Sequence, residues 1–401
     1  MSVSAMRAAP RPRDRPSLLK QRRWRKMACS AHAYVRGNTA RFYDWLEENS
    51  QDAIPAGPPV WICGDCHVGN LGPVVGADGR IQVMIRDLDQ AVIGNPAHDL
   101  IRLGLSLASA CRSANLPGAV SVKVVDALLD GYARAFTRRP HHKDAPGTIK
   151  ALLREAIGRS WKQLVREHLT HTQSHIPLGK RFWPLSKAER RAIAALLSPD
   201  ALGPLAVGLG IARPDDAVRM ADAAYWVKGC SSLGRPRYAV LLEIDEAGGQ
   251  NRLAMLDIKD APPAAAPRTT SSAMPRDNAE RVVAAAMALS PALGERMVAV
   301  RLLDRPMVLR ELAPHELKIE PDHMPPAVID EMGAYFGRIV GDAHARQMSA
   351  AQRKAWHGIL RASRSTQVDA PSWLWQAIVD ALASHERGYL QHCRRHIALI
   401  G

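Results

Sequence analysis

The sequence predicts an α+β fold in which a sheet-rich lobe is inserted into a helical lobe built from both ends of the chain. Apolar residues recur at helical spacing up to residue 210 and again after residue 325. Between them, strand-like runs with glycine-containing turns surround a single helical pattern. We therefore expect four parts: a basic, partly disordered tail (1–25), the first part of the helical lobe (26–210), the sheet-rich lobe (215–320) and the second part of the helical lobe (325–401).

The composition is that of an ordinary globular protein. Its 401 residues suffice for two lobes, 47% are hydrophobic, and the six cysteines show no disulfide-framework spacing. No apolar run is long enough to predict a membrane span, and the basic N-terminus lacks the apolar segment of an export signal, which favours the cytoplasm. The net charge of +15 favours anionic partners. Scattered tryptophans disfavour nucleic acid as a partner, and no feature indicates an oligomeric state.

The helical lobe is expected to contain one hairpin among its helices. The first helix is interrupted near residues 36–38, where glycine and asparagine break the apolar spacing. A later helix should begin with a capping box, because Ser186 is followed three residues on by Glu189. Helices are predicted over 18–48, 99–114, 120–136, 149–169, 185–197, 327–345, 350–360 and 373–397, with strands over 60–62 and 81–85 and the hairpin turn at 77–79.

The sheet-rich lobe is expected to form a small antiparallel sheet with one helix. A turn containing glycine and serine, residues 228–235, joins its first two strands, and a glycine pair at 248–249 joins the next two. A loop rich in proline and alanine precedes the helix. The strands are predicted over 224–227, 238–244, 253–258, 297–303 and 306–312, the loop over 262–275 and the helix over 279–289.

Acidic and amide side chains follow two strands of the helical lobe. Asp65 and Asn70 leave the strand at 60–62, and Asp87 and Asp89 leave the strand at 81–85. Oxygen ligands at adjacent strand ends can converge on one point. This pattern suits a hard cation such as Mg²⁺, which binds carboxylate and amide oxygens and keeps positions open for substrate phosphates.

Lys259 ends an apolar strand in a register that can point its side chain inward. The turn at 228–235 precedes it and offers backbone N–H groups that can cover phosphates. An inward lysine needs an anionic partner, which we expect to be Glu280 or Glu311 without ligand and nucleotide phosphates with it. The alternative is a lysine at a strand end that extends to water.

Cys63, Cys66 and His67 form a C-x-x-C-H string, the attachment pattern of haem c. The missing export signal and the adjoining buried strand disfavour haem, and zinc would lack a second ligand pair at a usual spacing. We expect the two cysteines to be small core residues. His344, on a late helix, is expected to have a structural partner, with a role in a pocket as the alternative.

A family resemblance rests on three motifs. The strings Gly64-Asp65-x-His67-x-x-Asn70, Asp87-x-Asp89 and Gly94-Asn95-Pro96-x-x-Asp99 resemble the catalytic segment of aminoglycoside and choline kinase-like phosphotransferases. The resemblance implies that Asp65 orients or deprotonates the acceptor hydroxyl. We expect His67 to brace the loop by hydrogen bonding, with contact to the acceptor as the alternative. The resemblance further implies that Asn70 and Asp87 hold the metal, that Asp89 helps with metal or structure, and that Asp99 braces the catalytic loop.

The same resemblance implies a nucleotide-binding lobe. In it the turn would cover the phosphates, Lys259 would contact them, Glu280 would pair with Lys259, and residues 309–312 would form the hinge that reads adenine. In kinases the turn and lysine precede the catalytic loop, whereas here they follow it, so the resemblance implies a circularly permuted, two-lobed protein-kinase-like fold. The turn residues expected to bind the nucleotide are Gly229, Ser231, Ser232 and Gly234.

The whole chain is also similar to a bacterial family catalogued as domain of unknown function 2252. Gln90 stands where an acidic residue is usual in that family, and the turn has fewer glycines than expected. The matching stretches are 26–37, 64–72, 87–89, 259–261, 281–283 and 343–346.

From these features we expect an ATP- and Mg²⁺-dependent phosphotransferase that acts on an unidentified acceptor. One alternative is a nucleotide-binding pseudokinase that serves as a regulatory module. Another is a nucleotidyl (AMP) transferase on the same scaffold, and a basic nucleic-acid binder is a third.

Overall fold

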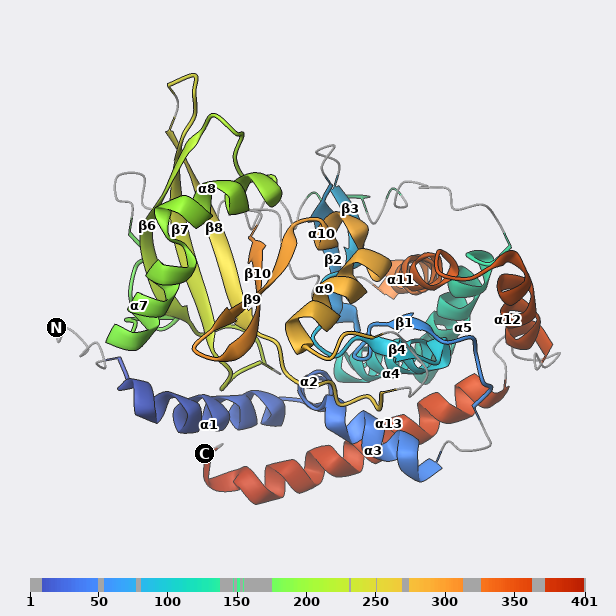
Figure 1. Ribbon diagram of the computed structural model, residues 1–401. Coiled ribbons are helices and arrows are strands. Elements are labelled where there is room, and N and C mark those ends of the chain that lie inside the picture. The colour runs from blue at the N-terminus through green and yellow to red at the C-terminus, as the bar shows by residue number, and fades with distance from the viewer. Residues whose placement is uncertain are drawn as a thin grey trace.

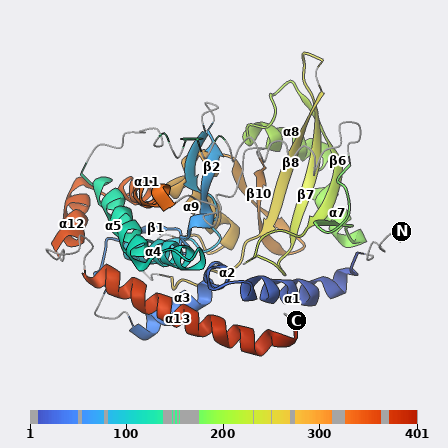
Figure 2. The same cartoon turned by 180° about the vertical axis from the view of Figure 1, so that it is seen from behind.

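The protein has two lobes, one dominated by a six-stranded sheet and the other by helices (Figure 1; Figure 2 from behind). A hairpin and a short pair of helices lie between them. The mixed α+β class predicted from the sequence is confirmed. The computed structural model describes residues 9–49, 54–76, 81–137, 147, 150–151, 154, 175–230, 232–249, 251–268, 274–312, 326–362 and 372–399.

The N-terminal segment is helical from residue 15 onward, which differs from the expected tail. Leu19 of its first helix is buried against the sheet-rich lobe, so burial fixes this basic segment to the body. The predicted interruption is present, because Asn38 separates two of the helices, and a second break falls at Ser30, which caps the next helix. The elements are η1 (Pro12–Asp14), α1 (Arg15–Ala28), α2 (Ala31–Gly37) and α3 (Thr39–Asn49).

Two short antiparallel pairs carry the predicted metal-binding loops. The strand before Asp65 pairs with a strand at 92–94 that the sequence did not indicate, and the strand before Asp87 pairs within the predicted hairpin. The hairpin turn at 77–79 lies outside the described residues. The elements are β1 (Val60–Ile62), η2 (Val68–Asn70), β2 (Leu71–Val75), β3 (Ile81–Ile85) and β4 (Val92–Gly94).

The helical lobe joins segments from both halves of the chain, but residues 182–208, which were expected in it, pack on the sheet of the other lobe. Its tightest contact is between α5 and α11, where a Cβ added to Gly131 would lie 1.9 Å from the carbonyl oxygen of Ala334. Glycine therefore allows the two helices to approach at backbone distance. The elements are α4 (Pro96–Ser113), α5 (Gly118–Arg134), α11 (Pro326–Ala345), α12 (Ala350–Ala362), α13 (Ser372–His396) and η4 (Ile397–Leu399).

The sheet-rich lobe is an antiparallel sheet of order β5-β6-β7-β8-β10-β9. Apolar side chains on one face pack against α7 and α8, and α9 lies toward the helical lobe (Figure 1). The predicted capping box of Ser186 and Glu189 is confirmed at α7. The elements are β5 (Phe182–Trp183), α7 (Lys187–Leu196), α8 (Pro199–Gly208), β6 (Ala217–Trp226), β7 (Arg237–Asp245), β8 (Asn251–Asp260), α9 (Asn278–Leu289), α10 (Pro291–Gly294), β9 (Met297–Leu302) and β10 (Arg305–Glu311).

Most of the helix predicted over 149–169 lies outside the described residues. Among the residues that are described, no helix combines the length and apolar character needed to cross a membrane.

Candidate functional site

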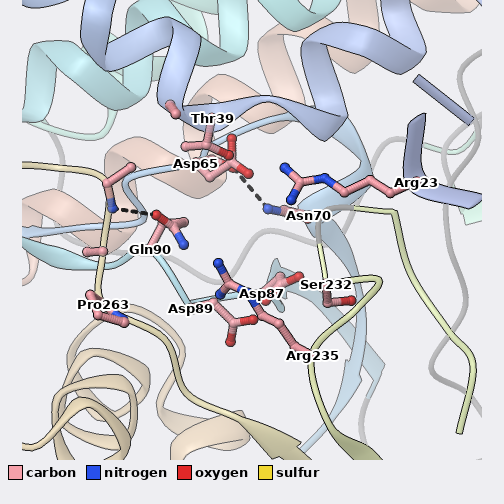
Figure 3. Close-up of a pocket in the computed structure, with 13 residues that line it drawn as sticks. Arg23, Thr39, Asp65, Asn70, Asp87, Asp89, Gln90, Ser232, Arg235 and Pro263 are labelled. Atoms are coloured by element: carbon pink, nitrogen blue, oxygen red, sulfur yellow. Dashed lines mark hydrogen bonds between the residues drawn. The ribbon is translucent and has the colours of Figure 1, made fainter. Parts of the chain in front are cut away.

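A pocket of about 160 Å³ lies where the two lobes meet (Figure 3). Its wall joins α1 and α3, the loops after β1 and β3, the turn between β6 and β7, and the segment after β8. The pocket is therefore lined by residues from loops that follow strands of different sheets. The lining residues are Arg23, Thr39, Ala40, Asp65, Asn70, Asp87, Asp89, Gln90, Ser232, Arg235, Pro263, Ala264 and Ala265.

Asp65 is held by Arg102 of α4 and lies in the pocket wall. Both Nε and an η-nitrogen of Arg102 approach the same carboxylate oxygen, Oδ1, at 3.0 and 2.9 Å, so Arg102 does not bind Oδ2. Burial raises the pKa of Asp65, and the charge of Arg102 and a hydrogen bond from Thr39 limit the rise. A fixed carboxylate with a raised pKa suits the acceptance of a proton.

The backbone that carries Asp65 is fixed by Asp99. Its carboxylate accepts the N–H groups of Cys63 at 2.6 Å and Gly64 at 2.9 Å. His344 Nε2 lies 3.2 Å from Asp99, and Tyr132 lies 2.9 Å from the other ring nitrogen of His344. Since a carboxylate only accepts, the proton of His344 belongs on Nε2 and Tyr132 donates to Nδ1. The bracing contact expected of Asp99 and the structural partner expected of His344 are both present.

Gly64 allows this loop to lie against the next one. Its φ is +71°, and an added Cβ would lie 2.1 Å from the carbonyl oxygen of Gln90. Only glycine fits such a position without moving the backbone. The side chain of Gln90 also accepts the N–H of Ala265 at 2.7 Å, which joins the loop after β3 to the segment after β8.

Lys259 of β8 forms ion pairs with two aspartates from the other lobe. Its Nζ lies 2.8 Å from Asp87 and 2.6 Å from Asp89. The side chain of Lys259 is 12% exposed, so the inward direction predicted for it is confirmed and the alternative of extending to water is wrong. Asp87 remains 39% exposed at the pocket wall. These contacts connect the lobes directly through charge.

A cluster of charges on β7, β8 and β10 adjoins these ion pairs. Arg237 and Arg310 both bind the buried carboxylate of Asp257. Burial alone would raise the pKa of Asp87, but Lys259 and these two arginines outweigh it and hold that pKa below its ordinary value. The positive charges of Lys259, Arg237 and Arg310 therefore act together on Asp87 at this side of the pocket.

The pKa of Asp89 is shifted in the opposite direction from that of Asp87. Burial, followed by the negative charge of Asp87, raises the pKa of Asp89, and the attraction of Lys259 only partly offsets this. Burial also opposes the charge of Lys259, yet the two aspartates raise its pKa above the ordinary value. The lysine thus stays charged beside the two carboxylates.

The two glutamates expected beside Lys259 lie elsewhere. By strand register Lys259 is opposite Val308 whereas Glu311 is opposite Leu256, so the two charged side chains point to opposite faces of the sheet. Glu311 pairs instead with Arg296. Glu280 is exposed in the first turn of α9 and forms no ion pair with Lys259 among the described residues. The predicted partnership is therefore wrong, because Asp87 and Asp89 satisfy the lysine.

Arg281, next to Glu280, is the residue of α9 that reaches the site. It is fully buried and donates to the carbonyl oxygens of Asp89 at 2.9 Å and Pro262 at 2.8 Å, and also to Ala91. Three carbonyl groups from two segments are thus held by one guanidinium. The structural link between α9 and the aspartate loop is an arginine that binds backbone, where the resemblance implied a glutamate that binds lysine.

The remaining predicted residues divide into those at the pocket and those away from it. Asn70 lines the pocket and donates its amide to the backbone oxygen of Asp65 at 2.9 Å. Ser232 also lines it, from a turn in which Gly229 and Gly234 have positive φ angles of 93° and 97°. His67 does not line the pocket and is buried 3.8 Å from Asp65. Ser231 lies outside the described residues.

The surroundings of His67 favour the neutral imidazole. Burial first, and then the charges of Arg102 and Arg36, hold the pKa of His67 well below its ordinary value. Its Nδ1 accepts or donates no hydrogen bond among the described residues. Contact of His67 with an acceptor is not supported by this position behind Asp65.

The donor set suits a hard divalent cation that brings further ligands with it. Asp87 and Asp89 supply carboxylate oxygens, and Oδ1 of Asp89 accepts no hydrogen bond among the described residues although Lys259 lies near it. Asn70 adds an amide at the same wall. Within the described part of the chain no three His, Cys, Asp or Glu side chains converge on a metal position. Mg²⁺ does not require such a cage, since it is commonly bound by one or two carboxylates plus phosphates and water.

The cysteines of the C-x-x-C-H string are core residues, as expected. Cys63 and Cys66 are buried at 0% and 1% exposure. Their mutual hydrogen bond and burial raise the pKa of the Cys63 thiol well above its ordinary value. Buried, neutral thiols are poor nucleophiles and poor metal ligands, which argues against both haem attachment and zinc.

Four arginines at or near the site were not identified from the sequence. Arg102 and Arg281 could have been identified, because each is a charged residue on the apolar face of a helix and such a residue needs a buried partner. Arg235 belongs to the turn at 228–235 but was not singled out. Arg23 left no signal, since it is one of many basic residues near the N-terminus.

Fold and site together define a two-lobed α+β protein with a charged pocket between its lobes. The pocket joins a braced aspartate, a lysine paired with two aspartates, and a glycine-containing turn. The chain belongs to a family described as an uncharacterized protein conserved in bacteria (DUF2252), whose model matches residues 15–395. No curated protein and no solved structure matches the chain significantly.

Proposed function

We propose that this protein is an ATP- and Mg²⁺-dependent phosphotransferase with a circularly permuted kinase-like fold, acting on an unidentified acceptor. One observation carries the proposal. Lys259 and Asp87 are 172 residues apart in sequence, yet they are 2.8 Å apart in space at a pocket that also contains Asp65. A lysine for phosphates, carboxylates for a metal and a carboxylate for a hydroxyl are the parts that phosphoryl transfer requires.

The order of elements in the sheet-rich lobe supports the kinase-like part of the proposal. The turn between β6 and β7 is followed by β8 with Lys259, then by α9, and then by β9 and β10. This is the order of turn, lysine, helix and hinge that the resemblance implies. In this chain these elements follow the loop of Asp65, whereas in kinases they precede the catalytic loop. We therefore propose a circular permutation.

In the proposed reaction Asp65 acts on the acceptor hydroxyl. The hydroxyl oxygen attacks the γ-phosphorus of ATP, a new O–P bond forms, and the bond to the bridging oxygen breaks to release ADP. The hydroxyl proton passes to Oδ2 of Asp65, the oxygen that Arg102 does not bind. Arg102 and Asp99 keep this carboxylate in place throughout.

Asp87, Asp89 and Asn70 would hold Mg²⁺, with Lys259 on the phosphates. Bound there, Mg²⁺ would neutralise phosphate charge. The pocket of about 160 Å³ is below the roughly 300–1,000 Å³ of typical ligand sites. We therefore propose that nucleotide entry opens the ion pairs between Lys259 and the two aspartates and widens the gap between the lobes.

The test is Mg²⁺-dependent turnover of ATP by the full chain, with ADP, AMP and pyrophosphate measured separately. We expect ADP formation that is abolished in Asp87→Ala and reduced about 10²–10⁴-fold in Asp65→Asn, the range for loss of a general base. Asp260→Asn is the matched control, because Asp260 adjoins Lys259 in the chain but pairs with Arg305 and does not line the pocket.

Other products would select among the alternatives. AMP with pyrophosphate would indicate a nucleotidyl transferase on the same scaffold. Normal ATP binding with no turnover and no labelling of any acceptor pool would contradict the enzyme and favour the pseudokinase. Steeply salt-dependent RNA or DNA binding without ATP binding would favour the nucleic-acid binder.

A further inference from the structure

Two arginines line the pocket: in Figure 3 Arg23 reaches in from the side of Asn70, and Arg235 extends beside Asp87 and Asp89. Arg23 comes from α1, which runs beneath the sheet-rich lobe (Figure 1), and Arg235 comes from the turn between β6 and β7. The guanidinium of Arg23 is anchored by a 2.7 Å hydrogen bond to the carbonyl oxygen of Gly37. A lysine of the same helix, Lys26, donates to Gly229 at 2.9 Å and so connects α1 to the turn.

Within the described part of the chain neither arginine forms an ion pair with a carboxylate. Asp65 pairs with Arg102, and the other pocket aspartates pair with Lys259. Burial, and then the neighbouring charge of Arg235, lowers the pKa of Arg23, yet a guanidinium remains charged at neutral pH. Two adjacent, uncompensated guanidinium groups form a site for an anion.

The position of Arg23 relates this anion site to the acceptor. Gly37, which anchors Arg23, is two residues from Thr39, and Thr39 hydrogen-bonds Asp65. Arg23 also lies near enough to Asp65 to be influenced by its charge. The positive groups that act most strongly on Asp87 are instead Lys259, Arg237 and Arg310. Arg23 therefore belongs to the Asp65 side of the pocket.

We propose that Arg23, assisted by Arg235, binds an anionic group of the acceptor. The acceptor is then a hydroxyl compound that also carries a phosphate or a carboxylate, held so that its hydroxyl meets Asp65. This inference rests on the proposed phosphotransferase function. The planar guanidinium binds either anion through paired N–H donors, so the chemistry of recognition is shared.

The experiment uses inorganic phosphate and acetate as probes of the full chain. Each is titrated by calorimetry in the presence of Mg²⁺ and a saturating non-hydrolysable ATP analogue, at constant ionic strength. We expect at least one of them to bind alongside the analogue, and Arg23→Gln to weaken that binding about tenfold, as for loss of one charged hydrogen-bonding group. Whichever anion binds identifies the acceptor group as phosphate or carboxylate.

Arg22→Gln is the matched control. Arg22 adjoins Arg23 on α1 and carries the same charge, but it lies over the ring of Trp183 and does not line the pocket. This variant should bind the probe as the native chain does. If Arg23→Gln fails to fold, Arg23→Lys keeps the charge but loses the paired donors and should still weaken binding.

Three results would overturn the inference. The first is that neither probe binds while the analogue does, and the second is that Arg23→Gln and Arg22→Gln bind the probe equally. The third is displacement of the probe by the analogue, which would place Arg23 on the nucleotide phosphates. Failure of the analogue itself to bind would contradict the proposed function, so the two failures are distinct.

Discussion

The two sides of the pocket are held in different ways. Asp65 lies on a loop whose backbone N–H groups and carboxylate are bound by buried partners of the same lobe, chiefly Asp99 and Arg102. On the other side, Asp87 and Asp89 are held by Lys259, which comes from the other lobe. Buried hydrogen bonds therefore hold the Asp65 side, whereas ion pairs at the pocket wall hold the Asp87 and Asp89 side.

This difference indicates which part of the site is preformed. Asp99 is fully buried, and water cannot replace the bonds it makes, so the loop of Asp65 has one arrangement. Asp87 is 39% exposed, so phosphate, water or a cation can take the place of its lysine. We expect the Asp65 side to stay fixed while the Lys259 side rearranges when ligand binds.

Among the changes considered, we expect substitution of Asp99 to reduce the stability of the protein most. Asp99→Ala removes the acceptor of two backbone N–H groups and leaves His344 without its carboxylate, and each buried group left unpaired costs about 1–3 kcal/mol. We expect the free energy of unfolding to fall by about 3–5 kcal/mol in urea titrations. Asp215→Ala, at an exposed position, is the control and should change it by less than about 0.5 kcal/mol. A small effect of Asp99→Ala would remove the distinction between the two sides.

Loss of the lysine should cost less and should be reversible. Lys259→Met leaves two aspartates at a pocket wall that water or Mg²⁺ can reach, so we expect a loss of about 1–2 kcal/mol without Mg²⁺. Added Mg²⁺ should restore much of this stability, since it binds only the folded state. The measurement is the thermal midpoint with and without Mg²⁺. Equal losses in both conditions would show that no cation can replace the lysine.

A smaller effect is expected from pH on metal binding. The pKa of Asp89 is raised by burial and by Asp87, whereas the pKa of Asp87 is lowered by its positive neighbours, so on acidification Asp89 gains a proton first. A metal binds the ionised carboxylate, so Mg²⁺ affinity in the presence of nucleotide should fall about tenfold per pH unit below the pKa of Asp89. Calorimetry over a pH series measures this. Asp89→Asn should flatten the dependence, and an unchanged slope in that variant would exclude Asp89 as the titrating ligand.

The sequence predicted the helices and strands better than it predicted which side chains pair with each other at the site. Local signals, such as the capping box of Ser186 and Glu189 and the inward register of Lys259, were sufficient because they depend on neighbours in the chain. The roles of Arg23 and Arg281 depend on segments that meet only after folding. Glu280 was misplaced beside Lys259 because order along the chain does not determine which way a helix faces the site. The catalytic and metal-binding roles themselves remain predictions.

We expect Asp87 and Asp89 to exchange Lys259 for a metal when nucleotide binds, and a Mg²⁺ titration can measure this exchange. Mg²⁺ is titrated by calorimetry into the native chain with and without a saturating non-hydrolysable ATP analogue, and into Lys259→Met without nucleotide. We predict no strong Mg²⁺ binding to the native chain alone, strong binding with the analogue, and a gain of binding in Lys259→Met that Asp87→Ala abolishes. Equal Mg²⁺ affinity of the native chain with and without the analogue would contradict the exchange.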